Sequence, residues 1–435
     1  MKTKLTPKFW LALTLFGLIG QIAWVVENMY LNVFIYKMFN ASASDISAMV
    51  AASAVAATLT TVFIGALSDK LGRRKIIMCL GYILWGVSII GFVAVNEWHE
   101  SARGALVTSM ATVSATCVTL VIVLDCVMTF FGSSANDAAY NAWLTDSTDA
   151  SNRGAAEGVN SMMPLVAILA VFGGFMAFDL DKSQSWSMIF LIIGAVVIIV
   201  GVIGLFIIKE PQISPVSDGY FSTVIYGFRP STVRSNASLY LTMLAFIVFN
   251  ISIQIFMPYL ILYYDVTLKM ENYVLIMAPA IVIASVATFF WGRVYDKKGF
   301  RLSSTVSLCA LSAGYLLLFL FKGTALVFIG SLLMMSGYLS GMAVFGARIR
   351  ELTPSGKSGM LQGVRIFSQV LVPGVIGPAI GELVLSNADQ TLNDDGTYSF
   401  VPSRYIFLAA LAAIAVLALL MVLLRRAMSE VKRDA

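Results

Sequence analysis

Long apolar runs separated by short polar stretches repeat along the whole chain. A membrane-spanning α-helix needs about 20 predominantly apolar residues. Runs of that kind predict twelve transmembrane helices, at residues 9–36, 46–67, 76–96, 116–145, 155–179, 186–208, 238–265, 272–294, 303–321, 324–347, 359–385 and 403–424. The ten-residue alternation typical of a membrane β-barrel does not recur, and a helix satisfies its own backbone hydrogen bonds in lipid. The pattern therefore predicts an all-α membrane protein.

The first run follows a basic start, "MKTKLTPK", which is the profile of a secretory signal peptide. No small-residue cleavage site follows that run, because the apolar sequence continues into "QIAWVVENMYLNVFIY". We interpret it as an uncleaved first transmembrane helix.

The longest polar segment on the side of the first residue, "KEPQISPVSDGYFSTVIYGFRPSTVRSNAS", separates the first six helices from the last six. We predict an N-terminal six-helix bundle over residues 1–208, a cytoplasmic connecting loop over 209–237, and a C-terminal six-helix bundle with a short tail over 238–435.

The distribution of positive charge gives the orientation. Most of the 29 lysines and arginines fall on the side of the membrane that holds the first residue, and cytoplasmic loops carry this excess. We expect a multi-pass protein of the cell (plasma or inner) membrane with both termini in the cytoplasm. The net charge of +5 is then a topology signal and does not indicate nucleic-acid binding.

Composition agrees with lipid as the main solvent. The chain is 59% hydrophobic and 12% charged, whereas soluble domains carry roughly 25% charged residues. All four cysteines fall in apolar runs, which favours small core residues over disulfides. The single histidine, His99, falls in a polar connection and argues against a histidine-based metal site. We expect a monomer without metal or cofactor, other than a coupling H⁺ or Na⁺.

Two charged loops follow the second helix of each half. The first basic loop is "GALSDKLGRRK", Gly65 to Lys75, and the second is "GRVYDKKGFR", Gly292 to Arg301. Glycine permits a tight turn and close helix approach, and an aspartate at a helix end accepts charge-assisted hydrogen bonds. We predict a breakable clamp between helices, a conformational gate made by Gly65, Asp69, Gly72, Arg73, Gly292, Asp296 and Gly299.

A weaker repeat supports two related halves. Arg153-Gly154-x-x-x-Gly158 follows the fourth helix, and Lys357-Ser358-Gly359-x-x-x-Gly363 follows the tenth. The two repeats have different offsets, so the first half holds extra residues, which we place outside the membrane around Trp98 to Ser114.

The first basic loop, G-x-x-x-D-K-x-G-R-R-K, closely resembles the signature loop of the major facilitator superfamily. In the second loop Phe300 replaces the first arginine after the glycine. The resemblance implies two pseudo-symmetric six-helix bundles, alternating access, and a central site lined by the first, fourth, seventh and tenth helices. No nucleotide-binding P-loop or catalytic triad is visible, so we do not expect an enzyme.

Ionisable residues inside spanning helices are costly and mark functional sites. Four stand out: Glu27, Asp125, Asp137 and Arg365. We predict that Glu27, Asp125 and Asp137 carry the coupling cation, since burial favours the protonated form of a carboxyl group. The alternatives are a structural salt bridge from Asp137 to Arg365, or positions near helix ends that reach water.

Polar side chains share faces of these helices. At about 100° per residue, Gln21, Asn28 and Asn32 fall on one arc of the first helix, with Trp24 beside it and Glu27 beyond. This arc suits a wetted cavity, although hydrogen bonds between helices would also use it. On the fourth helix, Asp125 shares a face with Thr129 and Asn136, and Asp137 shares another with Ser133, Tyr140 and Asn141.

In the second half, Asn250 and Gln254 are four residues apart in the seventh helix, and Arg365 would anchor an anionic group or pair with a carboxylate. The predicted solute contacts are Gln21, Trp24, Asn28, Tyr140, Asn141, Asn250, Gln254, Tyr338 and Arg365.

The segment "NDAAYNAWLTDSTDASNRGAAEGV" is similar to the fourth-helix region of the glycoside–pentoside–hexuronide:cation symporters. The resemblance implies that Asp137 matches the acid which that family uses for cation and sugar binding. That family also has acids in its second helix, and residues 46–67 contain none. This difference favours protons over sodium, with Glu27 supplying the missing charge.

We therefore expect a secondary transporter that imports a small polar solute, such as a sugar or glycoside, with protons or sodium. The main rival is a drug:proton antiporter, although its fifth-helix G-P-x-x-G-G signature is absent and the similar "GVIGPAIG" lies in the eleventh helix. A transporter-like sensor or a lipid scramblase is a more remote alternative.

Overall fold

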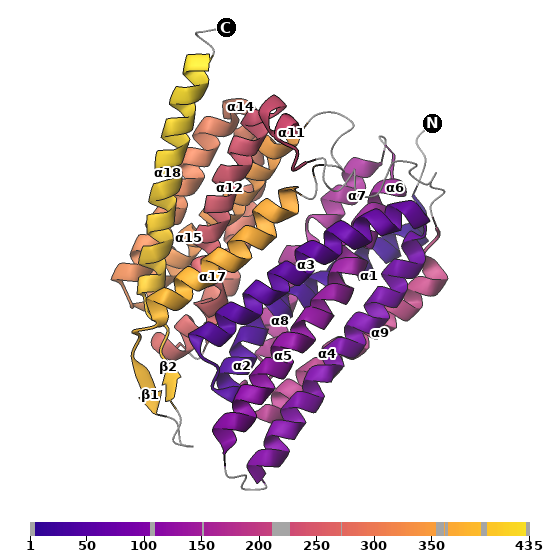
Figure 1. Cartoon of the computed structure of the whole chain (residues 1–435), viewed down its shortest axis with the longest axis vertical. Coiled ribbons are helices and arrows are strands. Elements are labelled where there is room, and N and C mark those ends of the chain that lie inside the picture. The colour runs from indigo at the N-terminus through magenta and orange to yellow at the C-terminus, as the bar shows by residue number, and fades with distance from the viewer. Residues whose placement is uncertain are drawn as a thin grey trace. The chain divides into compact units, whose positions relative to one another are not determined.

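The computed structural model describes residues 5–104, 109–149, 152–210, 227–270, 272–353, 361, 364–392 and 398–431. The chain divides into two compact units (Figure 1). Unit 1 comprises Met1–Val224 with Leu392–Ser399, and unit 2 comprises Ile225–Thr391 with Phe400–Ala435. The boundary at residue 224 falls inside the segment 209–237 that we expected to connect the halves.

Unit 1 contains six membrane-spanning stretches, three of them made of more than one element. Its elements are α1 (Pro7–Val25), η1 (Val26–Tyr30), α2 (Leu31–Phe39), α3 (Ala43–Leu71), α4 (Arg74–Gly104), α5 (Met110–Gly132), η2 (Ser133–Tyr140), α6 (Asn141–Asp146), α7 (Arg153–Asn160), α8 (Met163–Phe175) and α9 (Ser183–Ile207). The segments η1 and η2 are π-helical, so their turns are wider than those of the flanking α-helices.

Unit 2 is built in the same manner, and between its last two spans the chain forms a short two-stranded sheet that we did not predict and of which Leu392–Ser399 is counted with unit 1. Its helices, together with the hairpin strands, are α11 (Pro230–Ser235), α12 (Ala237–Phe256), η3 (Met257–Tyr259), α13 (Leu260–Leu262), η4 (Tyr263–Thr267), α14 (Val274–Leu320), α15 (Thr324–Leu352), η5 (Phe367–Leu371), α17 (Val372–Leu385), β1 (Gln390–Leu392), β2 (Tyr398–Phe400) and α18 (Tyr405–Val431).

Eleven helical stretches of the described chain are long and apolar enough to cross a membrane. One of them, α14, has 47 residues, or about 70 Å of helix against a hydrocarbon core of about 30 Å. Gly299 interrupts it with φ 74° and ψ 179°, a conformation outside the helical region. This break gives the two predicted helices 272–294 and 303–321, and the count of twelve is confirmed.

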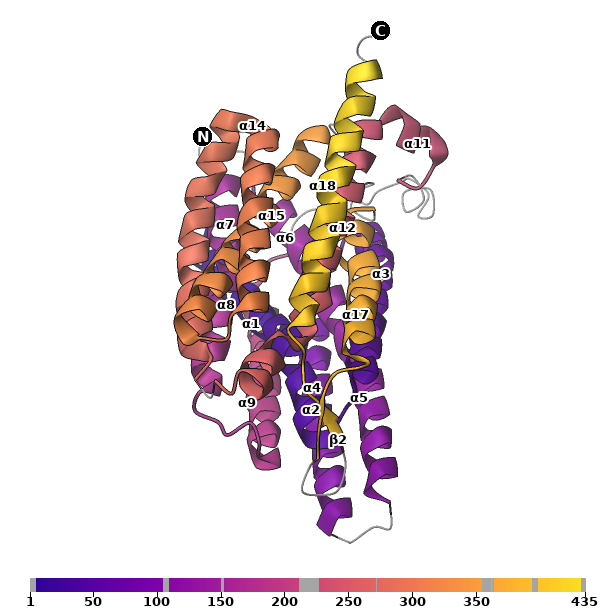
Figure 2. The same ribbon diagram turned by 90° about the vertical axis from the view of Figure 1, so that its left-hand side faces the viewer.

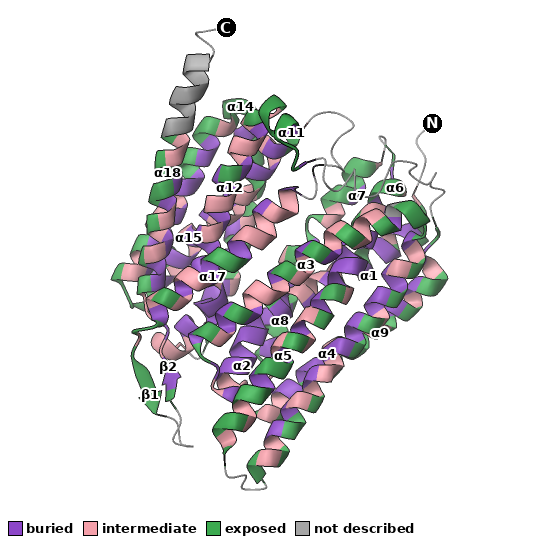
Figure 3. Cartoon of the chain, viewed as in Figure 1, coloured by how far each residue is buried: buried purple, intermediate pink, exposed green. Residues whose placement is uncertain are grey.

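Close helix packing holds each unit together through glycines. In unit 1, α4 lies along α9, and a Cβ built on Gly86 would lie 2.5 Å from the carbonyl oxygen of Gly194. In unit 2, α14 lies along α15, and a Cβ on Gly314 would lie 2.4 Å from the backbone nitrogen of Met334. Any side chain at these positions would separate the helices. Figure 3 shows buried residues facing the interior of each unit and exposed residues on the outer helix faces.

The segment around Trp98 to Ser114 differs from our expectation of a polar connection. Helix α4 continues to Gly104, and α5 begins at Met110. Asn96 donates to the carbonyl oxygen of Ser183 at 2.9 Å, and His99, which is buried, lies 3.1 Å from the hydroxyl of Ser114. These partners let polar residues extend the two helices, which project beyond their neighbours in unit 1 (Figures 1 and 2).

The prediction that all four cysteines are core residues is also only partly right. Cys79 and Cys117 are buried, but Cys126 is half-buried and Cys309 is exposed on the outside of its helix. An apolar run does not distinguish a residue that faces lipid from one that faces protein, because both surroundings are apolar.

Candidate functional site

The candidate site of unit 1 centres on a buried carboxyl group, Glu27. Its Oε1 accepts a hydrogen bond from Ser53 Oγ at 2.7 Å and another from Thr129 Oγ1 at 2.9 Å. The two hydroxyl oxygens lie 2.9 Å apart, so the three oxygens form a triangle contributed by η1, α3 and α5. We call these three residues the Glu27 triangle. Glu27 is only 6% exposed, and within the described chain its Oε2 has no hydrogen-bond partner.

The wide turn of η1 explains how Glu27 reaches this position. A π-turn inserts one extra residue into the helix and rotates everything that follows it. Asn32 is therefore fully buried, while Asn28 is exposed and donates to the carbonyl oxygen of Trp24 at 2.8 Å. The predicted arc of Gln21, Asn28 and Asn32 is wrong for this reason, since a regular 100° step does not hold across residues 26–30.

Asp125 lies one helical turn before Thr129 in α5 and is 2% exposed. Its Oδ1 has no partner among the described residues, and its charge and that of Glu27 act on each other. No described lysine or arginine forms an ion pair with either carboxyl group. Two acids buried without a counter-ion cannot both stay charged at reasonable cost.

The space beside Glu27 is small and apolar. A cavity of about 10 Å³ is lined by Glu27 together with Ala23, Val26, Leu31, Ile89, Phe92, Met128, Phe190 and Ile193. None of these neighbours offers a side-chain oxygen. In the described part of the chain, no three histidine, cysteine, aspartate or glutamate side chains gather as metal ligands.

Asp137 lies in η2, the second π-helical segment of unit 1. Ser133 Oγ donates to Asp137 Oδ2 at 3.0 Å, which agrees with the face predicted for this pair. Asp137 is half-buried, whereas Asp125 and Glu27 are buried. Its charge also acts on Glu27.

A second buried network fixes the Trp24 indole. Trp24 Nε1 donates to Asn136 Oδ1 at 3.3 Å, and Asn136 Nδ2 donates to the hydroxyl of Tyr82 at 2.7 Å. That hydroxyl donates in turn to the carbonyl oxygen of Phe16 at 2.6 Å. Trp24 also packs on Trp85, with ring centroids 5.0 Å apart. The network orients a half-buried aromatic face three residues before Glu27 in the chain.

The other predicted solute contacts of unit 1 separate into two groups. Gln21 is half-buried and Asn141 is exposed, so both are accessible. Tyr140 is buried, and its hydroxyl lies 2.8 Å from Asn160 Oδ1 and 3.1 Å from the carbonyl oxygen of Leu13. Because its polar group is used inside the bundle, we do not carry Tyr140 into the solute site.

In unit 2, Gln254, Tyr338 and Arg365 are half-buried. Asn250 is buried and donates to the carbonyl oxygen of Phe246, one turn earlier in α12. We therefore leave Asn250 out of the solute site as well. Gly377 of α17 lies against Gln254, since a Cβ there would be 2.4 Å from Gln254 Cβ. Gly377 of "GVIGPAIG" thus serves close helix packing.

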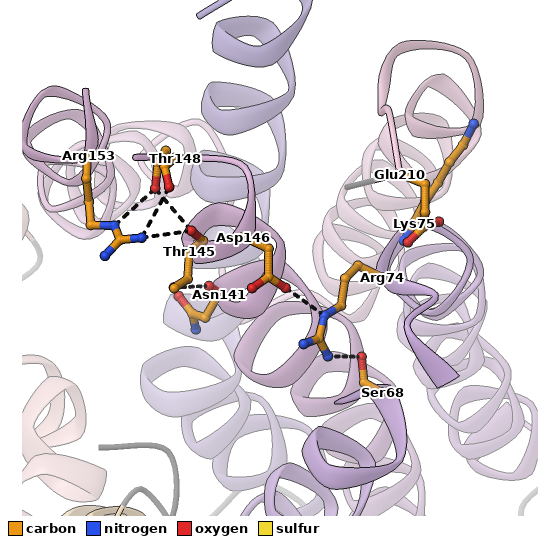
Figure 4. A network of polar contacts seen from close by, with 9 residues as sticks. All are labelled: Ser68, Arg74, Lys75, Asn141, Thr145, Asp146, Thr148, Arg153 and Glu210. Atoms are coloured by element: carbon orange, nitrogen blue, oxygen red, sulfur yellow. Dashed lines mark hydrogen bonds and ion pairs between the residues drawn. The ribbon is translucent and has the colours of Figure 1, made fainter. Parts of the chain in front are cut away.

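The first basic loop turns at Gly72, which has φ 62° and caps α3 with its backbone N–H on the carbonyl oxygen of Ser68. The arginine that makes contacts is Arg74, which we did not select. Arg74 Nε lies 3.1 Å from Asp146 Oδ2, and Arg74 Nη1 donates to Ser68 Oγ at 2.6 Å (Figure 4). Arg73, the predicted gate residue, is exposed, and Asp69 lies in α3.

Further charged groups stabilise this region, beginning with the end of α6 (Figure 4). Arg153 donates to the carbonyl oxygens of Thr145 and Thr148, each at 3.1 Å, where a cation satisfies the free carbonyls of a helix end. The backbone N–H of Lys75 lies 3.2 Å from both carboxylate oxygens of Glu210.

A cavity of about 430 Å³ beside Asp146 is lined by Leu5, Thr6, Phe9, Trp143, Asp146, Ser147, Thr148, Asp149, Asn152, Ile207 and Lys209.

The second basic loop is more open. Gly299 has a positive φ of 74°, as the predicted turn requires. Asp296 is exposed, and a Cβ on Gly292 would meet nothing within 4 Å. Arg293 instead lies over the rings of Phe289 and Phe290.

Comparison with known proteins agrees with this architecture. The family model of the Major Facilitator Superfamily matches residues 9–347. A bacterial homologue of the human lysosomal transporter Spinster, inward-facing and unoccupied, is similar with a TM-score of 0.69 and 14% identity, covering 96% of this chain and 97% of that one. The nucleoside transporter NupG is similar with a TM-score of 0.65 and 14% identity, covering 95% and 98%. No curated protein matches the chain by sequence.

The family and both structural neighbours are transporters, which are not enzymes. At these identities the neighbours inform the fold, while the family model spans most of the sequence. With twelve spans in two six-helix units and a glycine-turned basic loop after the second helix of each, the chain belongs to the Major Facilitator Superfamily.

Proposed function

We propose that the protein is a proton-coupled transporter that imports a small polar solute of the sugar or glycoside class by alternating access. Glu27 carries the coupling proton, and Asp137 is the second acid of the coupling path. The protein works in the cell membrane with both termini in the cytoplasm, and it works as a monomer.

The observation that carries the proposal is the Glu27 triangle. A carboxylate deep in an apolar bundle is costly to keep charged, so a proton or a cation must accompany it when it is buried. Glu27 is buried with no ion-pair partner in the described chain, and two hydroxyl groups satisfy one of its oxygens. This arrangement suits a group that gains and loses a proton.

The same distances favour a proton over sodium. The three oxygens of the triangle lie 2.7–2.9 Å apart, which is the separation of direct O–H···O hydrogen bonds and leaves no room for an ion between them. A hard cation is held by several oxygen ligands. The adjoining cavity of about 10 Å³ offers apolar walls instead.

The solute class rests on the accessible polar and aromatic side chains. In unit 1 these side chains are Gln21, Trp24, Asn28 and Asn141, and in unit 2, taken by itself, they are Gln254, Tyr338 and Arg365. Amides supply both donors and acceptors for hydroxyl groups, and an indole offers a flat apolar face that suits the C–H face of a sugar ring. The similarity of residues 136–159 to the glycoside–pentoside–hexuronide:cation symporters points to the same class.

The experiment begins with a thermal-shift screen of purified protein against glucose, xylose, lactose, melibiose, glucuronate, uridine, alanine and ethidium. Compounds that stabilise the protein are then added outside proteoliposomes that contain the pH dye pyranine and hold an inside-negative potassium diffusion potential. A symporter acidifies the interior only when solute is present. We expect Glu27→Gln to abolish this acidification and accumulation while exchange of labelled for unlabelled solute continues.

Two results would contradict the proposal. If Glu27→Gln still concentrates solute against its gradient, Glu27 does not carry the coupling ion. If ethidium stabilises the protein and leaves the vesicles as protons enter, the drug antiporter is the better assignment.

A further inference from the structure

Four polar side chains follow one another at steps of four residues along the fourth span: Asp125, Thr129, Ser133 and Asp137. On a regular α-helix, each step of four residues rotates by about 40°, so a stripe of this length would wind around the helix. The π-helical η2 begins at Ser133, and its wider turns counter that rotation. We call these four residues the acid–hydroxyl stripe.

Contacts within the structure connect most of the acid–hydroxyl stripe. Thr129 donates to Glu27 at 2.9 Å, and Ser133 donates to Asp137 at 3.0 Å. Asp125, one turn before Thr129, is buried with an unpartnered Oδ1 in the described chain. The stripe therefore has a carboxyl group at each end, and the Glu27 carboxyl group contacts it near the middle.

One interval of the stripe is open. The structure shows no hydrogen bond between the side chains of Thr129 and Ser133, although the Ser133 backbone N–H donates to the Thr129 carbonyl oxygen and places them one α-turn apart. Side chains at that spacing have Cβ atoms about 5–6 Å apart. From Cβ atoms at that spacing, two hydroxyl oxygens can come within hydrogen-bond distance when the side chains turn toward each other.

From this geometry we propose that Thr129 and Ser133 relay the coupling proton between Glu27 and Asp137, and that the interval between them is the switch of the relay. Ser53 holds Glu27 in contact with Thr129. This inference rests on the proposed function, because it assigns a path to the proton that Glu27 carries.

The relay conserves atoms and charge at each step. The proton leaves the Glu27 carboxyl group for Thr129 Oγ1 as the hydroxyl proton of Thr129 passes to Ser133 Oγ. The hydroxyl proton of Ser133 passes to Asp137 Oδ2, to which it is already hydrogen-bonded. One O–H bond forms and one breaks at each hydroxyl oxygen, and the net result is a carboxylate at Glu27 and a carboxylic acid at Asp137.

An open interval is a useful property in a coupled transporter. A permanent chain of hydrogen bonds would conduct protons in every conformation and dissipate the gradient. The gap between Thr129 and Ser133 confines transfer to the moments when both side chains rotate toward each other. Asp125 lies at the opposite end of the stripe from Asp137, one helical turn before Thr129.

The test needs no knowledge of the solute. Infrared spectroscopy of purified protein in lipid follows the carbonyl band of protonated Glu27, identified by its loss in Glu27→Gln. After a change from H₂O to D₂O, the rate at which that band shifts reports proton exchange at Glu27. We expect Ser133→Ala to slow this rate on the order of tenfold or more, and Ser133→Thr, which keeps a hydroxyl group, to restore it.

Ser134→Ala is the matched control. Ser134 is a buried neighbour whose hydroxyl donates to the Phe130 carbonyl oxygen and lies outside the acid–hydroxyl stripe. We expect its removal to leave the exchange rate unchanged. If Ser133→Ala exchanges at the wild-type rate, or if Ser134→Ala slows exchange equally, the relay is overturned while the proposed function stands. If the wild-type protein shows no Glu27 carboxylic acid band from pH 5 to pH 8, the proton-carrier role fails, and the relay fails with it.

Discussion

Units 1 and 2 are packed in the same way, yet their interiors hold different chemistry. Glycines bring α4 against α9 in unit 1 and α14 against α15 in unit 2. The buried acidic and basic side chains of the described chain, however, all belong to unit 1: Glu27, Arg74, His99 and Asp125. The buried polar groups of unit 2 are neutral, such as the pair of hydroxyls of Tyr264 and Ser331.

This difference separates two tasks that one transporter must perform. A shared helix frame lets both units act as solid bodies, since packed helices move together. Under the proposed function, protonation of Glu27 would change the electrostatics of unit 1, where these groups lie. Four predictions test the common frame and then the difference between the interiors.

We expect the largest loss of stability where glycines let two helices pack most closely. Gly194→Val in unit 1 and Gly314→Val in unit 2 place atoms within 3 Å of neighbouring backbone or side-chain atoms. We expect each to destabilise its unit by about 3 kcal/mol, because overpacking forces the helices apart. Thermal unfolding in detergent measures this loss. Gly173→Ala, where a Cβ meets nothing within 4 Å, should be harmless; equal losses at Gly173 and Gly194 would mean that the glycine contacts do not set the packing.

The next effect concerns the first basic loop. Arg74→Gln removes the ion pair with Asp146 and leaves Ser68 without its buried donor. We expect a loss of about 2 kcal/mol, the range for hydrogen bonds to charged groups, and faster amide hydrogen exchange at the α6 end. Arg73→Gln, at an exposed arginine, should cost less than about 0.5 kcal/mol. A larger loss for Arg73 than for Arg74 would restore our original choice of gate residue.

A third comparison sets one buried tyrosine against another. Tyr82→Phe in unit 1 removes an acceptor from Asn136, whose amide is then poorly satisfied, at a cost of about 2 kcal/mol. Tyr264→Phe in unit 2 leaves Ser331 bonded to the Val327 carbonyl oxygen, so we expect about 1 kcal/mol. Melting temperatures of the two variants rank these costs. Equal costs would show that the two networks are equivalent.

The smallest effect belongs to a surface carboxylate. Lys182 donates to Asp179 at 3.0 Å and holds the pKa of Asp179 below its ordinary value of 3.8. A lowered pKa stabilises the fold above the unfolded value and loses that contribution as pH falls through the folded value. Asp179→Asn should therefore leave unfolding unchanged at a pH low enough to protonate Asp179 in the folded state, and should lower the melting temperature only slightly at pH 7. A large decrease at pH 7 would mean that this exposed ion pair contributes more to stability than such surface pairs usually do.

The helices themselves could be predicted, because a membrane span needs about 20 predominantly apolar residues in a row. Twelve apolar runs gave twelve spans, and the spacing of Gly72 and Gly299 within the basic loops identified the turns. The carboxyl groups at Glu27 and Asp125 were found by the cost of charge in an apolar run. The hydrogen-bond partners of these acids were harder to predict, because Ser53 lies among small residues of α3 and no local pattern marks it.

Two of the errors in the site, Asn32 and Tyr140, share one physical cause, whereas Asn250 lies in the regular helix α12 and is buried there. We placed side chains around each helix at about 100° per residue, as in a regular α-helix. The π-helical segments at 26–30 and 133–140 change the direction of the side chains that follow them in the same span. Asn32 and Tyr140 were placed on open faces and are buried. The choice of Arg73 over Arg74 had a related origin, since adjacent residues point in different directions and only the fold shows which one meets Asp146.

The projecting part of α4 and α5 has a practical consequence. Two continuous helices, ending at Gly104 and starting at Met110, stand clear of the rest of unit 1 (Figure 2). Splicing a rigid helical protein in phase into both ends would add an asymmetric landmark to a small particle with little mass outside the detergent. Electron microscopists could then align images of this transporter without an antibody fragment.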